Sequence, residues 1–130
     1  TNLSGALRYF TNVIKKRCTA FLLSDFYDDS YTDALKIAAG KHDLVSIRIA
    51  DEKEEHLPDL GLVKFYDPES GRTQWVDTSD RAIRTRFEQH CSEHNHRVDE
   101  IFTKYGIDCT TLYTGEDFVK PLIKLFKMRS

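Results

Sequence analysis

A short run of apolar residues that leads into an acidic residue constrains the fold of this chain more than any other feature. The run is Ala20–Leu23, and Ser24 and Asp25 follow it. A continuous apolar run is typical of a parallel strand that helices cover on both faces. Ligands of open α/β sheets bind in the crevice at the carboxyl ends of such strands. The sequence therefore predicts an α/β fold with Asp25 at the mouth of that crevice.

Length and charge limit the classes of protein to which the chain can belong. Its 130 residues are about the size of one domain, so we expect a single domain over 1–130. Its formal net charge of -2 argues against binding to nucleic acid or to a membrane surface, because both need an excess of basic residues. No apolar stretch reaches the roughly 18 residues of a membrane helix, so we expect no membrane insertion.

The cysteines favour a reducing compartment. Cys18 and Cys109 fall inside predicted strands, where a free thiol behaves as a small apolar side chain. Together with Cys91 they make three, which cannot all pair, so a cytoplasmic location is the simpler interpretation. A helical pattern begins close to Thr1, so we also expect the chain to be a piece of a longer protein.

Alternating helix and strand patterns predict a parallel sheet with right-handed crossovers. A capping box at Ser30–Asp33 is expected to start the second helix, and Gly40 to end it. The expected architecture is a Rossmann-like, doubly wound, mainly parallel sheet with an inserted β-hairpin. The predicted elements are helix Leu3–Ile14, strand Cys18–Leu23, helix Ala34–Ala39, strand Leu44–Ile49, hairpin strands Leu62–Tyr66 and Thr73–Val76, helix Ser79–Tyr105, strand Cys109–Tyr113, and a last helix that begins near Pro121 or is kinked there.

Acidic and hydroxyl side chains gather in the loop after the first strand. Ser24, Asp28 and Asp29 accompany Asp25 there. Mg²⁺ prefers oxygen ligands such as these and keeps several of its waters. The loop is therefore a candidate cation site. The alternative is a solvated acidic loop in which Asp28 or Asp29 caps the next helix.

A second acidic stretch, Asp51–His56, follows the next predicted strand. It therefore also falls at the carboxyl edge of the sheet, where it could hold a cation or meet a basic partner. A solvated charged loop is the alternative.

The long helix places two histidines, His90 and His94, on its apolar face together with Cys91. Histidines four residues apart can share a transition metal, but no third ligand is identifiable. A packed face with hydrogen-bonded histidines is the simpler interpretation. Trp75, in the predicted hairpin, either packs there or serves as an exposed interaction anchor.

Short motifs spread over nearly the whole chain form an ordered pattern. They are Thr1–Leu3, Ala6–Leu7, Leu22–Phe26, His42–Val45, Asp51, Glu54, Leu57–Pro58, Gly61, Asp67–Gly71, Val76–Thr78, Phe118, Pro121–Leu122, Leu125–Phe126 and Arg129. In this order and spacing they resemble the bacterial family called "domain of unknown function 58", which is von Willebrand factor A-like. The resemblance implies a doubly wound sheet, of which this chain is the C-terminal part.

The resemblance also implies a metal-ion-dependent adhesion site at the carboxyl edge of the sheet. Such a site uses an Asp-x-Ser-x-Ser loop, a threonine from a second loop and an aspartate from a third. Thr1 takes the threonine position and Asp25 the third-loop aspartate, whereas the Asp-x-Ser-x-Ser loop is absent from this sequence. Mg²⁺ is thus the implied cofactor, with an incomplete site in this chain. The residues expected to contact a partner are Ser24, Asp28, Asp29, Asp51 and Glu54.

The missing half of the family fold supplies the strand that lies beside Cys18–Leu23. Without that neighbour, the strand becomes an open apolar edge, which invites pairing with another chain. We therefore expect self-association through this edge, giving a homo-oligomer.

Two classes of function follow from these observations. The resemblance implies a non-enzymatic protein–protein interaction module that works alongside AAA+ ATPases of the MoxR type. In such a module a carboxylate of the partner completes the metal shell. The alternative is a metal-dependent hydrolase or phosphotransferase that uses Asp25 with Asp28 or Asp29, which needs a base and an electrophile stabiliser in the same crevice. We expect the module rather than the enzyme.

Overall fold

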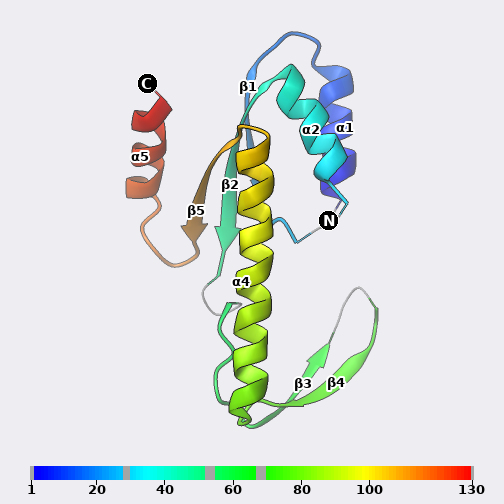
Figure 1. The fold of residues 1–130 in the computed structure, drawn as a ribbon, viewed down its shortest axis with the longest axis vertical. Helices are drawn as coiled ribbons and strands as arrows, with labels where there is room; N and C mark the ends of the chain where they lie inside the picture. The colour runs from blue at the N-terminus through cyan, green and yellow to red at the C-terminus, as the bar shows by residue number, and fades with distance from the viewer. Residues whose placement is uncertain (1, 28–29, 52–54, 67–69, 130) are drawn as a thin grey trace. The chain divides into compact units, whose positions relative to one another are not determined.

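The computed structural model describes residues 2–27, 30–51, 55–66 and 70–129. The chain divides into two compact units, Thr1–Ala50 with His96–Ser130 and Asp51–Asn95, which we describe separately. The single domain expected over 1–130 stays a prediction. In chain order the elements are α1 (Leu3–Val13), β1 (Thr19–Ser24), α2 (Thr32–Lys41), β2 (Asp43–Ala50), β3 (Leu62–Tyr66), β4 (Thr73–Asp77), α4 (Arg81–Lys104), β5 (Asp108–Tyr113) and α5 (Val119–Arg129), as labelled in Figure 1.

The first unit is built on a parallel sheet of three strands in the order β1-β2-β5. Thr19 of β1 lies beside Asp43 of β2, and Val45 of β2 lies beside Asp108 of β5. Each strand enters the sheet after a helix, which is how parallel strands are connected. The mixed α/β architecture with a parallel sheet is therefore confirmed.

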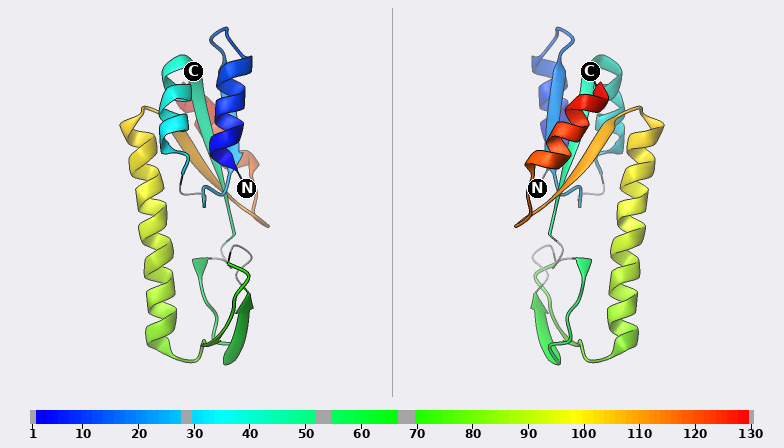
Figure 2. Two further views of the ribbon diagram at one scale, coloured as in Figure 1. Left: turned by 90° about the vertical axis from the view of Figure 1, so that its right-hand side faces the viewer. Right: turned by 90° about the vertical axis from the view of Figure 1, so that its left-hand side faces the viewer.

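Helices cover the two faces of this sheet unequally (Figure 2). Alternate strand residues point to opposite faces, so Leu44 faces the apolar core. The opposite face carries α5, whose Arg129 forms ion pairs with Asp43 and Asp108. The buried core residues are Leu3, Leu7, Phe26, Tyr31, Ala34, Leu35, Ala38, Leu44, Val98, Phe102 and Ile107.

β1 is much less covered than its sequence predicts. It lies at the edge of the sheet, and its side chains alternate between exposed and half-buried. Phe21 is 46% exposed and Leu23 is 61% exposed. The Phe21 ring contacts the ring of Phe126 on α5, at 5.9 Å between centroids. The expectation that helices bury this run on both faces is wrong, because α5 reaches only part of β1.

Both ends of α2 also differ from the prediction. The helix begins at Thr32 rather than Ala34, and its N-cap is Tyr31, whose side chain makes no cap hydrogen bond. The capping box at Ser30–Asp33 stays a prediction. At the other end the helix continues through Gly40 to Lys41, and the N–H of His42 donates to the carbonyl of Ala38 at 2.9 Å. The imidazole of His42 is buried, so tertiary packing prolongs the helix past the glycine.

The last helix begins as the sequence predicts. α5 starts at Val119, so Pro121 lies in its first turn. A proline is tolerated there because the first-turn N–H groups have no partner within the helix. The N–H of Val119 donates instead to Asp117 Oδ1 at 3.0 Å.

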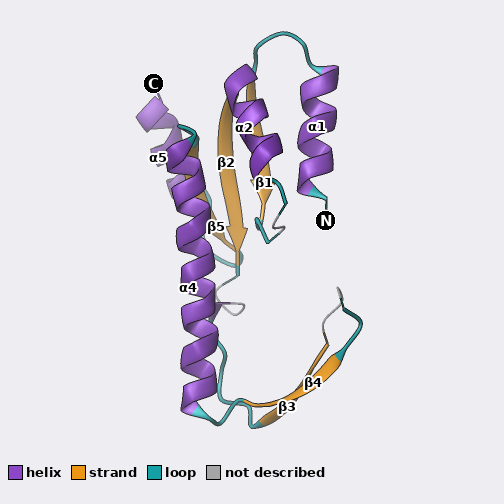
Figure 3. Ribbon diagram, turned by 45° about the vertical axis from the view of Figure 1, so that its right-hand side comes forward, coloured by secondary structure: helices purple, strands orange, loops and turns teal. Residues whose placement is uncertain are grey.

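The second unit contains the inserted hairpin and the first part of α4 (Figure 3). Strands β3 and β4 pair antiparallel, with Val63 opposite Val76, which confirms the predicted hairpin. Thr78 closes the base of the hairpin, because its hydroxyl accepts from the N–H of Leu60 and donates to the carbonyl of Gly61. Arg84 of α4 donates to the carbonyl of Thr78, which ties the helix to the hairpin.

Two remaining expectations concern the state of the cysteines and the absence of a membrane helix. Cys18, Cys91 and Cys109 all carry free thiols. Among the described residues, no helix combines the length and the apolar character that crossing a membrane requires. A cytoplasmic location stays a prediction.

Candidate functional site

The turn after β1 presents Asp25 at the carboxyl edge of the sheet. β1 ends at Ser24, whose Oγ accepts a hydrogen bond from the N–H of Phe26 at 3.1 Å. Asp25 Oδ1 accepts from the N–H of Tyr27 at 3.2 Å. These two side chains shape the turn from within and leave the Asp25 carboxylate exposed. Asp25 thus follows the carboxyl end of β1, as predicted, and a ligand crevice at this position stays a prediction.

Phe26 anchors this turn in the core. Its φ is 59°, in the left-handed region that bulky residues rarely adopt. Its ring is fully buried and packs against the rings of Phe102 and Tyr31, at centroid distances of 4.9 and 5.8 Å. Burial of the ring therefore holds a strained backbone in place beside Asp25. The sequence does not predict this strained conformation, because Phe26 has no local feature that distinguishes it from the other apolar residues.

A row of polar side chains crosses the sheet next to this turn. Ser24, Arg48 and Thr111 are partners in the strand register, so they share one face of the sheet. Arg48 is only 7% exposed. On the same face, the pKa of the Cys109 thiol is raised to about 11, mainly by burial and also by the charge of Asp99, whereas Arg48 acts to lower it. Arg48 thus places a buried positive charge at the carboxyl edge, which local sequence patterns do not reveal.

Of the two predicted Mg²⁺ ligands, Thr1 and Asp25, the structure describes only Asp25. Within the described residues, no three His, Cys, Asp or Glu side chains lie in a group that could hold a metal ion. Asp51 belongs to the second unit, and Ser24 and Asp25 to the first. Thr1, Asp28, Asp29 and Glu54 lie outside the described residues. The described side chains do not by themselves fit a Mg²⁺ site, and Mg²⁺ binding stays a prediction.

His42 stabilises the sheet at the amino ends of β1 and β2, opposite the carboxyl edge. Its Nδ1 accepts from the backbone N–H of Cys18 at 3.2 Å and lies 3.5 Å from the Cys18 thiol. Its ring packs against Phe10 at 4.8 Å. The neighbouring Asp43 is paired with Arg129. These contacts give His42 a structural role, since they join the start of β1 to α1 and to the start of β2.

The two histidines of the long helix α4, His90 and His94, differ in burial. Cys91 and His94 are buried, whereas His90 is exposed, so the placement of all three on one apolar face is wrong. A helix turns 100° per residue, which separates His90 from the centre of the face that Cys91 and His94 share. Burial raises the pKa of the Cys91 thiol, and the charges of Glu55 and Glu88 raise it further.

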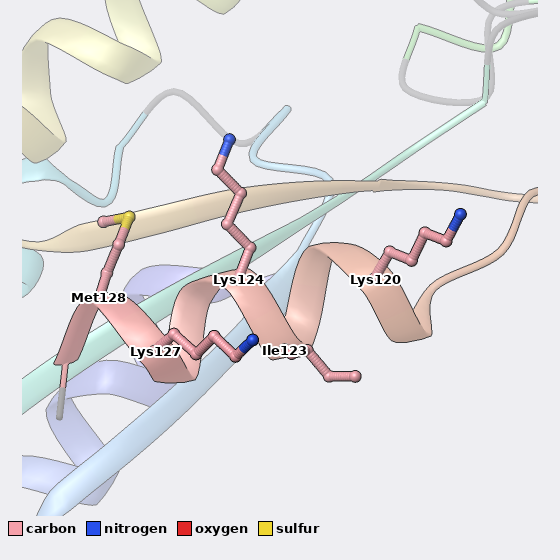
Figure 4. Close-up of a pocket in the computed structure, with 5 residues that line it drawn as sticks. All are labelled: Lys120, Ile123, Lys124, Lys127 and Met128. Atoms are coloured by element: carbon pink, nitrogen blue, oxygen red, sulfur yellow. The ribbon is translucent and has the colours of Figure 1, made fainter.

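Exposed apolar side chains gather on β1 and α5. We call Phe21, Leu23, Ile123 and Phe126 the β1–α5 surface, since all four are exposed and Phe21 touches Phe126. A shallow pocket of about 510 Å³ adjoins it on α5 (Figure 4). Its lining combines three lysines with two apolar side chains, namely Lys120, Lys124, Lys127, Ile123 and Met128.

The hairpin carries an exposed apolar face of its own. Trp75 is 62% exposed, and Lys64, its cross-strand partner, places its Nζ 5.8 Å from the centre of the indole ring. Leu62 and Tyr66 lie on the same face and are also exposed. Trp75 is therefore not packed within the described hairpin, which favours the interaction anchor over the packed alternative.

The sequence profile of the family described as "Protein of unknown function DUF58" matches residues 1–97. The chain belongs to this family. An uncharacterized protein of Mycobacterium avium is 28% identical over 129 residues, which cover 98% of this chain and 76% of that protein. Uncharacterized proteins of Mycobacterium bovis and Mycobacterium tuberculosis (strain H37Rv) are 26% identical over 116 residues, or 88% of this chain. The chain covers only 36% of the length of these two relatives. No solved structure matches the chain.

Proposed function

We propose that this DUF58 chain is a non-enzymatic protein–protein interaction module, and that the open edge of β1 pairs with a second copy of the chain. Two observations on β1 carry the proposal: among the described residues no strand pairs with its outer edge, and it has exposed apolar side chains. Family resemblance adds that the sheet is the C-terminal part of a Rossmann-like, von Willebrand factor A-like fold.

The register of the sheet identifies which backbone groups face the open edge. The N–H of Asp43 donates to the carbonyl of Cys18 at 2.9 Å. In a parallel ladder alternate residues bond to the neighbouring strand, so Ala20 and Leu22 face β2. Phe21 and Leu23 direct their N–H and C=O groups toward the open edge. The residues with free backbone groups are thus those with exposed apolar side chains.

Nothing within β1 protects this edge from pairing. Natural proteins blunt edge strands with lysine, other charges, proline or bulges. The sequence of β1, Thr19–Ser24, contains neither a charged residue nor a proline. An uncharged apolar edge suits a partner of the same kind, and two-fold pairing uses one patch twice. If antiparallel pairing is centred on Leu22, Phe21 of one copy lies opposite Leu23 of the other.

The carboxyl edge supplies a second contact in this proposal. Asp25 is exposed there on a turn that Phe26 anchors. The resemblance implies that Asp25, with Ser24 beside it, meets a partner carboxylate through Mg²⁺, and that an AAA+ ATPase of the MoxR type works with the module. Titration with Mn²⁺ checks the metal, since amide resonances around Asp25 broaden if it binds. Turnover of a phosphoester that is lost in Asp25→Ala would instead favour the hydrolase or phosphotransferase.

The pairing is tested by measuring molar mass with size-exclusion chromatography and light scattering over a range of concentrations. For the unmodified chain we expect the mass to rise above the 15.1 kDa of one copy toward twice that value. Leu23→Lys places a charge on the edge and should keep the chain at one copy. Ile37→Lys is the matched control, because Ile37 is an exposed apolar residue on α2. A single copy at every concentration, or a Leu23→Lys chain that associates like the unmodified one, contradicts the proposal.

A further inference from the structure

Arg48 is a buried cation, and two of its guanidinium nitrogens have no hydrogen-bond partner among the described residues. Its Nε and Nη1 atoms are shielded from solvent and make no hydrogen bond there. The Oγ of Ser46, on the same face of β2, is also buried and has no hydrogen-bond partner within the described ranges. Two residues along a strand are about 7 Å apart, so these donors face one small region of the sheet.

An unpaired guanidinium is a costly group to bury. Arginine stays charged in proteins, so it cannot escape burial by losing its proton. Removing a charge from water carries a penalty that only a well-placed counter-charge offsets. Asp99 is a described acid of this region, since its charge acts on the same Cys109 thiol as Arg48. Asp99 is exposed on α4 and forms no ion pair with Arg48 among the described residues.

The position of Arg48 within the sheet indicates where a counter-charge can enter. Arg48 lies near the carboxyl end of β2, beside Ser24, the last residue of β1. Ligands of open parallel sheets enter at this edge. Ser24, Thr111 and Ser46 place hydroxyl groups around Arg48 on the same face, and hydroxyls donate to anions as readily as they accept from cations.

We propose that Arg48 binds the carboxylate group of a ligand from outside the chain, at the carboxyl edge of the sheet. The planar guanidinium matches a carboxylate in shape and forms paired, charge-assisted hydrogen bonds with it. One guanidinium balances the single charge of a carboxylate, whereas a phosphate carries nearly two negative charges at neutral pH. The site does not depend on whether β1 pairs with a second copy.

The test follows the Nε–H resonance of Arg48 in the ¹⁵N-labelled chain by NMR. Sodium acetate, sodium chloride and inorganic phosphate are titrated separately at constant ionic strength. The resonance should move and saturate with acetate, with an apparent affinity about 10-fold or more above that for chloride. No saturable movement with acetate overturns the proposal, and tighter binding of phosphate than of acetate overturns the assignment to a carboxylate.

Variants separate an external carboxylate from an internal partner. The unfolding temperature should rise with acetate in the unmodified chain and in Arg8→Met, since Arg8 is exposed on α1. The rise should disappear in Arg48→Met. Asp99→Asn should leave the acetate response intact. If Asp99→Asn moves the Arg48 resonance without acetate and removes the response, Asp99 is the partner and the proposal fails. The titration of the unmodified chain decides the question even if Arg48→Met does not fold.

Discussion

Replacement of Phe26 should reverse the usual order of stability between alanine and glycine. The structure combines two features at this residue, a fully buried ring and a φ of 59°. Both Phe26→Ala and Phe26→Gly lose the ring, which costs about 3–5 kcal/mol at a core position. The two variants therefore differ only in what the backbone experiences.

The sign of the difference follows from the backbone. Alanine in the left-handed region keeps a strain of about 1–2 kcal/mol, which glycine does not have. Glycine loses about 0.5–1 kcal/mol through the greater freedom of the unfolded chain. The bonds to Ser24 Oγ and Asp25 Oδ1 hold the turn when the ring is gone. Phe26→Gly should thus be more stable than Phe26→Ala by about 0.5–1 kcal/mol, from the difference of these two effects.

The assay is urea unfolding followed by circular dichroism of the helices, because Trp75 lies in the other unit and is a poor probe of this one. Ala39→Gly is the control for the normal order. Ala39 lies inside α2, where glycine should cost about 1 kcal/mol. The reasoning is refuted if Phe26→Ala is as stable as Phe26→Gly, or more stable, while Ala39→Gly behaves normally.

Three further predictions follow from charges and thiols. The Cys109 thiol has its pKa raised from 9.0 to about 11 by burial, so the free energy of unfolding should fall between these pH values, and a Cys109→Val chain should lack that part of the fall. Hydrogen bonds from Ser79 lower the pKa of Asp77 in the folded chain. The stability that these bonds contribute is therefore present above the pKa of Asp77 in the unfolded chain, and it is lost as the pH falls through the pKa in the folded chain. Ser79→Ala should raise the Asp77 pKa in an NMR titration, and an unchanged pKa refutes this. Arg129→Ala should destabilise the chain by about 1 kcal/mol in urea unfolding, less in high salt, whereas the exposed Lys124→Ala should change little.

Local patterns predict the elements of this fold well, because spacing of apolar residues reflects which face is buried. The parallel strands, the hairpin and the start of α5 all follow from such spacing. The end of α2 does not, since burial of His42 outweighs the preference of Gly40. Coverage of β1 does not follow either, because an apolar run looks the same whether helices cover one face or both.

In the candidate site, too, local sequence patterns predict some features and miss others. Asp25 follows a predicted strand, so topology alone places it at the carboxyl edge. Arg48 stands within a strand of apolar residues, and its lack of a counter-charge depends on residues far away in the chain. The strain at Phe26 likewise arises from packing against Phe102 and Tyr31, which no local pattern records.

The most direct test of pairing at the β1 edge is residue-resolved amide hydrogen exchange at low and high protein concentration. The N–H groups of Ala20 and Leu22 face β2, so they should be protected at both concentrations. Those of Phe21 and Leu23 should exchange quickly in the dilute chain and become protected as concentration rises. Fast exchange of Phe21 and Leu23 at every concentration, or equal protection at every concentration, would contradict pairing with a second copy.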